Sequence, residues 1–427
     1  MKASAKASAL IACITILAAF AFLAACQPDS LAETDSCMEC HSGDSTLGNA
    51  VLAAQAQYES SGHFLGPRTL VESTLNIGHM YVFHGSNAMY TNGSNCSKCH
   101  THQGFVDFVA AGMPTTWNQA YMAASQPGCF TCHKPHVSGD FSMRKTSSET
   151  LISGGTPFDG GSGNLCVTCH KSLTDSSVLL PGGAKTWTVR DGPHHGPQAD
   201  FMMGTNHRPF GMNSYVGQSV HYTDPGLSKT CTGCHMYNPS ARLSGTLELG
   251  GHGMYLTGDV HGTNSNVIGS CRNCHNYPVS GTGAPILISS AGATMTGGFE
   301  TALAPDLNVN TTLAAIRANR DLLIVYFGTN ATFTVGGNTG GRRLTAVGGG
   351  DVLAAGEWQK DWVFTSSLAG AGSFTLTEAN SFAYWNFLYF IEDKSHGIHN
   401  PYFAHQILYD SVQAVGLTPV GSPPDRP

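Results

Sequence analysis

The chain has 427 residues, of which 41% are hydrophobic and 11% are charged, and this is enough material for one large or two ordinary globular domains. Its formal net charge is −7 and it has no basic block, so nucleic acid is not an expected partner. The 51 glycines predict long loops and modest regular structure, and we therefore expect something other than an ordinary apolar core to stabilise the fold.

The first residues have the pattern of an export signal. Two lysines precede an apolar run, Ala9 to Ala25, that is too short to span a bilayer comfortably. The run ends in Leu23-Ala24-Ala25-Cys26, which resembles a bacterial lipobox, and Gln27 after it favours the outer membrane. The alternative is an ordinary leader cleaved nearby. We predict a lipoprotein-type signal peptide over residues 1–25, lipidation of Cys26, and export to the outer-membrane surface or the extracellular space.

The cysteines follow one repeated pattern, Cys-x-x-Cys-His. Twelve of the fourteen cysteines fall in six such motifs, and the other two lie within and at the end of the leader. The paired cysteines are Cys37 and Cys40, Cys96 and Cys99, Cys129 and Cys132, Cys166 and Cys169, Cys231 and Cys234, and Cys271 and Cys274. The histidines that follow them are His41, His100, His133, His170, His235 and His275.

This spacing is typical of covalent haem attachment. Two cysteines separated by two residues form thioethers with a haem, and the adjacent histidine then ligates its iron from the proximal side. Zinc ribbons need two cysteine pairs for each metal, and a disulfide or thioredoxin-like interpretation leaves six histidines unexplained. We therefore predict six covalently bound c-type haems.

The six motifs are close together in the chain. They span 239 residues, 37–275, or about 40 residues for each haem, which is too few for a separate domain around each. The haems are therefore expected to share walls and to form the core, and the apoprotein is expected to be largely unfolded. We predict a hexahaem-binding region over residues 26–275.

The sixth iron ligand decides between electron transfer and substrate binding. Fourteen of the twenty histidines lie outside the motifs, enough to close all six irons as bis-histidine sites. Methionines such as Met80 or Met254 are an alternative at individual haems.

Several short sequence patches resemble those of extracellular multihaem cytochromes from metal-reducing bacteria. The patches include Gly192-Pro193-His194-His195-Gly196-Pro197-Gln198-Ala199-Asp200 and Gly397-Ile398-His399-Asn400-Pro401. The family includes the outer-membrane cytochromes S and E, which polymerise into filaments, and the resemblance extends from Cys37 to about Leu417. It implies distal ligands at His63, His136, His194, His221, His252 and His399, with His195 as the alternative to its neighbour and His79 in reserve.

Residues 276–427 contain no haem motif. Their early part is rich in Gly, Ser and Thr, with apolar runs such as Leu322–Phe327, and we expect a small, partly β or loop-rich region there. Thr377 to Asp393 has a capping threonine and an apolar stripe, which predict a helix, and a second helix is expected after Pro401. The predicted fold class is a loop-rich multihaem cytochrome c, with short helices around a haem core and a small mixed β/α C-terminal region that supplies a distal ligand.

The function that fits these features is extracellular electron transfer without catalysis, with the chain as a possible filament subunit. The expected partners are redox cytochromes, porin–cytochrome complexes and extracellular acceptors, and the protein would touch the membrane through a lipid on Cys26. The alternative is a reductase of nitrite, hydroxylamine or sulfite with one open haem. Nitrite reductases often mark that haem with lysine in place of the motif histidine, and all six motifs here end in histidine.

Overall fold

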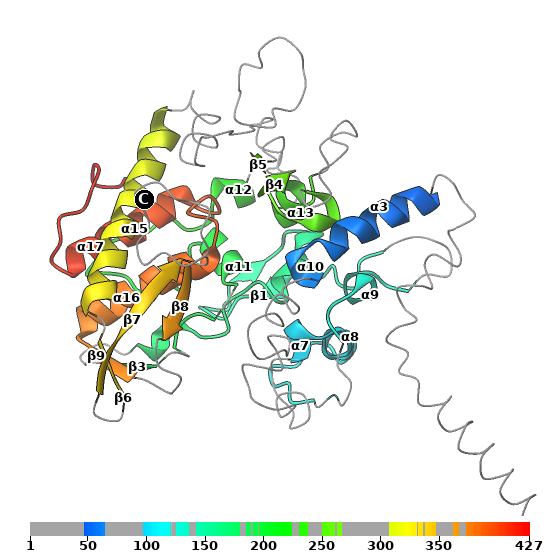
Figure 1. Cartoon of the computed structure of the whole chain (residues 1–427), viewed down its shortest axis with the longest axis horizontal. Helices are drawn as coiled ribbons and strands as arrows, with labels where there is room; N and C mark the ends of the chain where they lie inside the picture. Colours follow the sequence, from blue (N-terminus) through cyan, green and yellow to red (C-terminus); the bar gives the residue numbers. More distant parts are fainter. Residues whose placement is uncertain are drawn as a thin grey trace, which may run out of the picture. The chain divides into compact units, whose positions relative to one another are not determined.

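The computed structural model describes about half of the chain (Figure 1). The described residues are 47–64, 97–119, 121, 125–135, 142–179, 185–188, 191–194, 196–223, 230–237, 250–260, 263–266, 307–330, 332–335, 338–346, 362–366 and 373–427. The predicted site residues outside them are Cys26, Cys37, Cys40, His41, Cys96, His136, His195, Cys271, Cys274 and His275, together with the predicted signal peptide.

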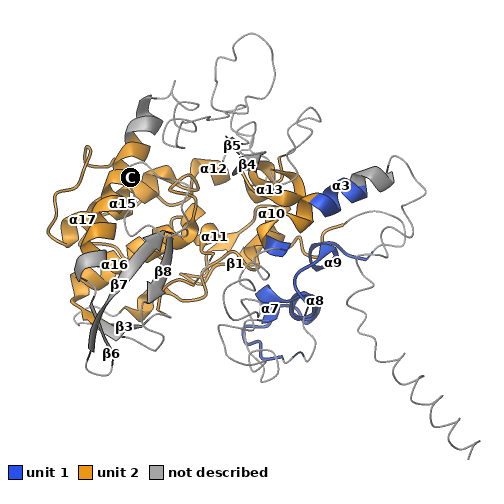
Figure 2. Cartoon of the chain, viewed as in Figure 1, with its two compact units in different colours: residues 1–56, 63–141 blue, residues 57–62, 142–427 orange. Residues whose placement is uncertain are grey.

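The chain divides into two compact units (Figure 2). Unit 1 comprises residues 1–56 and 63–141, and unit 2 comprises residues 57–62 and 142–427. The division between the units falls inside the predicted hexahaem region, so motifs two and three belong to unit 1 while motifs four and five belong to unit 2. The predicted boundary at residue 275 stays a prediction.

Unit 1 contains three short helices around a small aromatic core. They are α7 (Ser97–His100), α8 (His102–Ala110) and α9 (Cys129–Cys132), and α3 (Leu47–Glu59) starts in this unit. The Thr101 side chain caps α8 by accepting a hydrogen bond of 3.0 Å from the Gly104 N–H. Phe108 and Trp117 are buried edge to face, with ring centroids 5.4 Å apart. The second motif therefore lies on a packed element.

The first half of unit 2 consists of short elements. Its helices are α10 (Gly163–Val167), η2 (Ser176–Val178), α11 (Gln198–Met202), α12 (Val220–Thr223), α13 (Thr230–His235) and η3 (Gly251–Gly253). Its strand pairs are β1 (Glu149–Thr150) with β2 (Pro157–Phe158) and β4 (Thr257–Val260) with β5 (Thr263–Asn266), both antiparallel. The short helices predicted for the motif region are confirmed in these described residues.

A five-stranded antiparallel sheet joins distant parts of unit 2. Its order is β3 (Lys185–Thr188), β9 (Ser373–Leu376), β6 (Thr332–Val335), β7 (Asn338–Ala346) and β8 (Trp362–Ser366). In the β3–β9 register Trp187 lies opposite Phe374. Because β3 comes from the predicted haem region and β9 from the predicted C-terminal region, the two regions share one sheet.

Three long helices form an apolar core at the C-terminal end. They are α15 (Leu307–Asn330), α16 (Glu378–Asp393) and α17 (Pro401–Ala414), and α17 packs on both of the others. Buried aromatic side chains fill this core, with Trp187 and Phe201 reaching it from β3 and α11. The expectation that no ordinary apolar core stabilises the chain is wrong for this part, because buried aromatic and aliphatic side chains concentrate here.

The predicted helices after Thr377 and Pro401 are confirmed as α16 and α17. The prediction of strand or loop around Leu322–Phe327 is wrong, because this run lies inside the 24-residue helix α15. Leu323 and Phe327 are four residues apart and are both buried in the C-terminal core, as helical spacing requires. A six-residue apolar run does not by itself distinguish a buried strand from a buried helix.

Candidate functional site

Three Cys-x-x-Cys-His motifs are described completely, and each one forms a helical turn. In the third motif His133 N–H donates to the Cys129 carbonyl at 3.0 Å, and in the fourth His170 N–H donates to the Cys166 carbonyl at 2.8 Å. The fifth motif lies within α13. None of the seven cysteines that the structure describes is in a disulfide, and all are half-buried.

Each complete motif has a threonine between its cysteines that hydrogen-bonds outside the motif. Thr131 lies 2.8 Å from Nδ1 of His102, at the start of α8. Thr168 donates to Oε1 of Glu149 at 3.0 Å, and Thr232 lies 2.7 Å from the Ser162 hydroxyl. These bonds connect the helical turns of the motifs to neighbouring segments. The bond of Thr232 links the fifth motif to Ser162, the residue before α10, and α10 carries part of the fourth motif.

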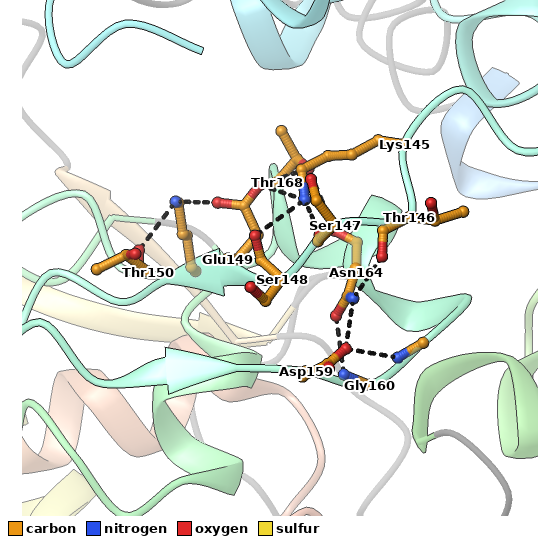
Figure 3. Close-up of polar contacts among 12 residues, drawn as sticks. Lys145, Thr146, Ser147, Ser148, Glu149, Thr150, Asp159, Gly160, Asn164 and Thr168 are labelled. Atoms are coloured by element: carbon orange, nitrogen blue, oxygen red, sulfur yellow. Dashed lines mark hydrogen bonds and ion pairs between the residues drawn. The ribbon is translucent and has the colours of Figure 1, made fainter. Parts of the chain in front are cut away.

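A buried polar network holds the fourth motif (Figure 3). Glu149 forms ion pairs with Lys145 at 2.9 Å and with Lys171 at 2.6 Å, and only 2% of the Lys145 side chain is exposed. Asn164 in α10 donates to Asp159 at 2.8 Å and to the Thr146 carbonyl at 2.9 Å. The segment around β1 is thus bound to the turn that carries Cys166 and Cys169.

Replacing Glu149 by glutamine should lower the free energy of unfolding by about 3–5 kcal/mol at neutral pH, because the buried Lys145 ammonium loses its counter-ion. Urea unfolding of the haem-loaded protein measures this. Lys185→Gln is the matched control, because its pair with Asp191 is about one-quarter exposed on each side, and we expect a loss of about 1 kcal/mol or less. Equal losses in the two variants would contradict a structural role for the Glu149 network.

The ion pairs of Glu149 also predict how the stability of the protein depends on pH. Burial raises the pKa of Glu149, but hydrogen bonds and charges from Lys171 and Lys145 outweigh burial, so the net pKa lies below the ordinary 4.5. A lowered folded-state pKa contributes stability above the unfolded-state value, and this stability disappears as the pH falls through the folded-state pKa. The difference between the wild type and Glu149→Gln should therefore shrink in acid.

Gln198 orients His170, the histidine of the fourth motif. Its Nε2 donates to the Asp393 carbonyl at 3.1 Å, so its Oε1, 3.1 Å from Nδ1 of His170, acts as the acceptor. His170 must then carry its proton on Nδ1, which presents the Nε2 lone pair to iron. Gly196, with φ 95°, allows this approach, since a Cβ there would lie 3.3 Å from Oε1 of Gln198.

Helix α11 brings two further groups to the fourth motif. Ala199 N–H donates to the His170 carbonyl at 3.1 Å, and Ser172 N–H donates to Oδ2 of Asp200 at 2.7 Å. Burial raises the pKa of Asp200 to about 6. Burial also lowers the pKa of His170, so this imidazole stays neutral, as iron ligation requires.

In the fifth motif His235 faces His399. Nδ1 of His235 donates to the Met254 carbonyl at 3.0 Å, and Nδ1 of His399 lies 2.7 Å from Oδ1 of Asp393. Both rings therefore keep Nε2 for a metal. Burial, followed by the nearby His399, lowers the pKa of His235. Burial lowers that of His399 as well, but Asp393 more than compensates, and the net pKa of His399 is raised.

The spacing of these two rings is compatible with two imidazoles that would hold one metal ion between them. Their centroids are 6.2 Å apart, with an interplanar angle of 53°. Two imidazoles bound on opposite sides of a metal, with bonds of about 2.0 Å and ring radii of about 1.15 Å, have centroids about 6.3 Å apart. Cys231 of the same motif is close enough to His399 to affect its pKa. The residues present thus fit a haem held between His235 and His399.

Four other predicted distal histidines lie within the described residues: His63, His194, His221 and His252. Nδ1 of His221 donates to the Ile398 carbonyl at 2.7 Å, which leaves Nε2 as the ligating nitrogen and holds this ring beside the His399 segment. The His252 N–H donates to Oε1 of Gln57 at 3.1 Å. His63 and His194 are exposed, and His194 has a φ of 72°. Their roles stay predictions.

Three residues with roles at these sites were not assigned any from the sequence. Gln198 belongs to the patch that carries the resemblance, but its amide gave no sign of what it contacts. Asp393 is six residues before His399, and an acidic residue this close to a candidate ligand is a weak signal for a hydrogen bond to its imidazole. His102 was a histidine beside a motif, and its contact with Thr131 depends on tertiary structure.

Neither a clustered metal site nor a membrane-spanning helix occurs within the described residues. No group of three or more His, Cys, Asp and Glu side chains gathers there as a direct metal site. No helix in the same part of the chain is long and apolar enough to cross a bilayer.

The motif turns and the facing imidazoles are typical of the class of proteins that bind c-type haem. Residues 24–179, a little over a third of the chain, match the family described as outer membrane cytochrome MtrC/MtrF-like, domains II/IV. The matched part includes four of the six motifs and supports an outer-surface multihaem cytochrome of the kind found in metal-reducing bacteria. Comparison with curated proteins and with solved structures gave no match.

Proposed function

We propose that this protein carries electrons at the outer surface through six covalently bound bis-histidine haems, without acting on a substrate at any of them. The observation that carries this proposal is the 6.2 Å separation of His235 and His399. With Nδ1 of each ring bound to the protein, both Nε2 atoms are available to close one iron from both sides.

Contacts between the fourth and fifth motifs support electron transfer between them. Ser162 and Thr232 link the two anchor turns, and Cys231 packs against the apolar cluster that contains Val167 of the fourth motif. His170 and His235 both lie close enough to His399 for its charge to lower their pKa. When bound, each haem supplies an iron that changes between the ferric and ferrous states. The hydrogen bonds to Nδ1 of His170, His235 and His399 would hold these rings in place and limit their reorganisation.

The outer-surface location is supported by the family match, and we extend it to exchange with porin–cytochrome partners and extracellular acceptors. Polymerisation into a filament similar to those of the outer-membrane cytochromes S and E is the more specific form of the proposal. A lipid on Cys26 would favour a membrane-anchored module instead. The mass of the mature amino terminus distinguishes these two assemblies.

Three measurements test the proposal. A pyridine haemochrome assay should give six haems for each chain, and electron paramagnetic resonance of the oxidised protein should show low-spin iron alone. Protein-film voltammetry should give reversible waves that nitrite, hydroxylamine and sulfite leave unchanged. A high-spin signal together with a catalytic wave would instead favour the multihaem reductase.

A further inference from the structure

Asp393 is a buried carboxylate in an unfavourable position. It is the last residue of α16 and is 1% exposed. The carboxyl end of a helix carries partial negative charge, so a buried acid there costs stability. A residue that breaks a local rule in this way is a candidate for a functional role.

The side chain of Asp393 accepts hydrogen bonds from His399 and from Ser395. Oδ1 receives the Nδ1–H of His399 at 2.7 Å, and Oδ2 receives the Ser395 N–H at 3.3 Å and the Ser395 hydroxyl. The Ser395 hydroxyl oxygen also accepts the His399 N–H at 3.1 Å. Within the described part of the chain Asp393 forms no ion pair with a lysine or arginine. Its charge is therefore directed at the imidazole of His399.

A carboxylate in this position changes the reduction potential of the iron through the histidine to which it is hydrogen-bonded. It draws the Nδ1 proton, which makes the imidazole a stronger electron donor at Nε2. Ferric haem carries one more positive charge than ferrous haem, so a nearby negative charge stabilises the ferric state. Burial strengthens this effect because the local dielectric constant is low. The reduction potential of that haem is therefore lowered.

The other histidines of unit 2 with described Nδ1 contacts have neutral acceptors. Nδ1 of His235 contacts the Met254 carbonyl, that of His170 contacts the Gln198 amide, and that of His221 contacts the Ile398 carbonyl. We propose that Asp393 is a positioning residue that lowers the reduction potential of the haem held between His235 and His399. The inference rests on the proposed pairing of these two histidines.

The test is a potentiometric titration of the full, haem-loaded chain carrying Asp393→Asn, followed by electron paramagnetic resonance. Asparagine keeps the shape and an acceptor oxygen but removes the charge. One midpoint should rise by about 59 mV, which corresponds to a tenfold change in the ferric-to-ferrous ratio. All irons should stay low-spin, and Asp393→Glu should return the midpoint toward the wild-type value. Asp425→Asn, which removes an exposed carboxylate, should leave every midpoint unchanged.

The outcomes separate this inference from the proposed pairing. If His399→Ala produces a high-spin haem while Asp393→Asn shifts no midpoint, the pairing stands and the role of Asp393 is overturned. A high-spin signal in Asp393→Asn also overturns the role, because the carboxylate would then be needed for ligation itself. If His399→Ala leaves all irons low-spin, the pairing fails.

Discussion

Replacing His399 by alanine is expected to convert one haem of the oxidised protein from low-spin to high-spin. His399 faces His235 at a centroid distance of 6.2 Å, and its removal opens one coordination position. The remaining haems should keep their spectra, because each has its own proximal histidine and the other candidate distal histidines are unchanged. Optical and electron paramagnetic resonance spectra of the purified chain measure the change.

Two further variants make the His399 result specific. Added imidazole should restore the low-spin state in His399→Ala by filling the open position, and His399→Met should keep a sixth ligand and raise one midpoint potential. His405→Ala is the control, because this buried histidine of α17 is not a predicted ligand and its loss should leave all spin states unchanged. A wholly low-spin His399→Ala spectrum would contradict the pairing.

Replacing Phe201 by alanine is expected to lower the free energy of unfolding by about 3–5 kcal/mol. Phe201 lies on α11 and is completely buried, with its ring 5.2 Å from those of Tyr389 in α16 and Phe403 in α17. A cavity there should also loosen Gln198 of the same helix, which orients His170. We therefore expect a change in the spectrum or potential of the fourth haem before global unfolding.

Urea denaturation followed by tryptophan fluorescence and by the haem absorption band measures both effects of Phe201→Ala. Val178→Ala is the control, because Val178 is 52% exposed and its truncation should change the free energy of unfolding by about 0.5 kcal/mol or less. A loss below about 1 kcal/mol in Phe201→Ala would contradict the view that the aromatic core supports the haem-binding helices.

Helix prediction was correct where the local sequence carried the whole signal. Thr377 caps α16 and Pro401 begins α17, and both are local features. It was wrong for Leu322–Phe327, since this run is apolar even at its exposed position, Val325, and so has no polar face to show its period. The run belongs to α15, which packs against α17, and α17 is distant from it in the sequence.

The sequence by itself determined the chemistry of attachment. Two cysteines and a histidine within five residues are enough to specify a haem anchor and a proximal ligand, because one helical turn brings them together wherever it lies in the fold. Because fourteen further histidines are present, a second histidine ligand on each iron was the expected state. Both inferences needed no knowledge of distant contacts.

Only the tertiary structure decided which histidine faces which. His235 and His399 lie on segments far apart in the chain, and no local pattern encodes their distance of 6.2 Å. The same is true of Gln198 and Asp393, which select the protonated nitrogen of His170 and His399. How strongly a second ligand donates electrons depends on the groups that folding places beside it. The reduction potential of each iron is therefore expected to depend on packing rather than on the motif.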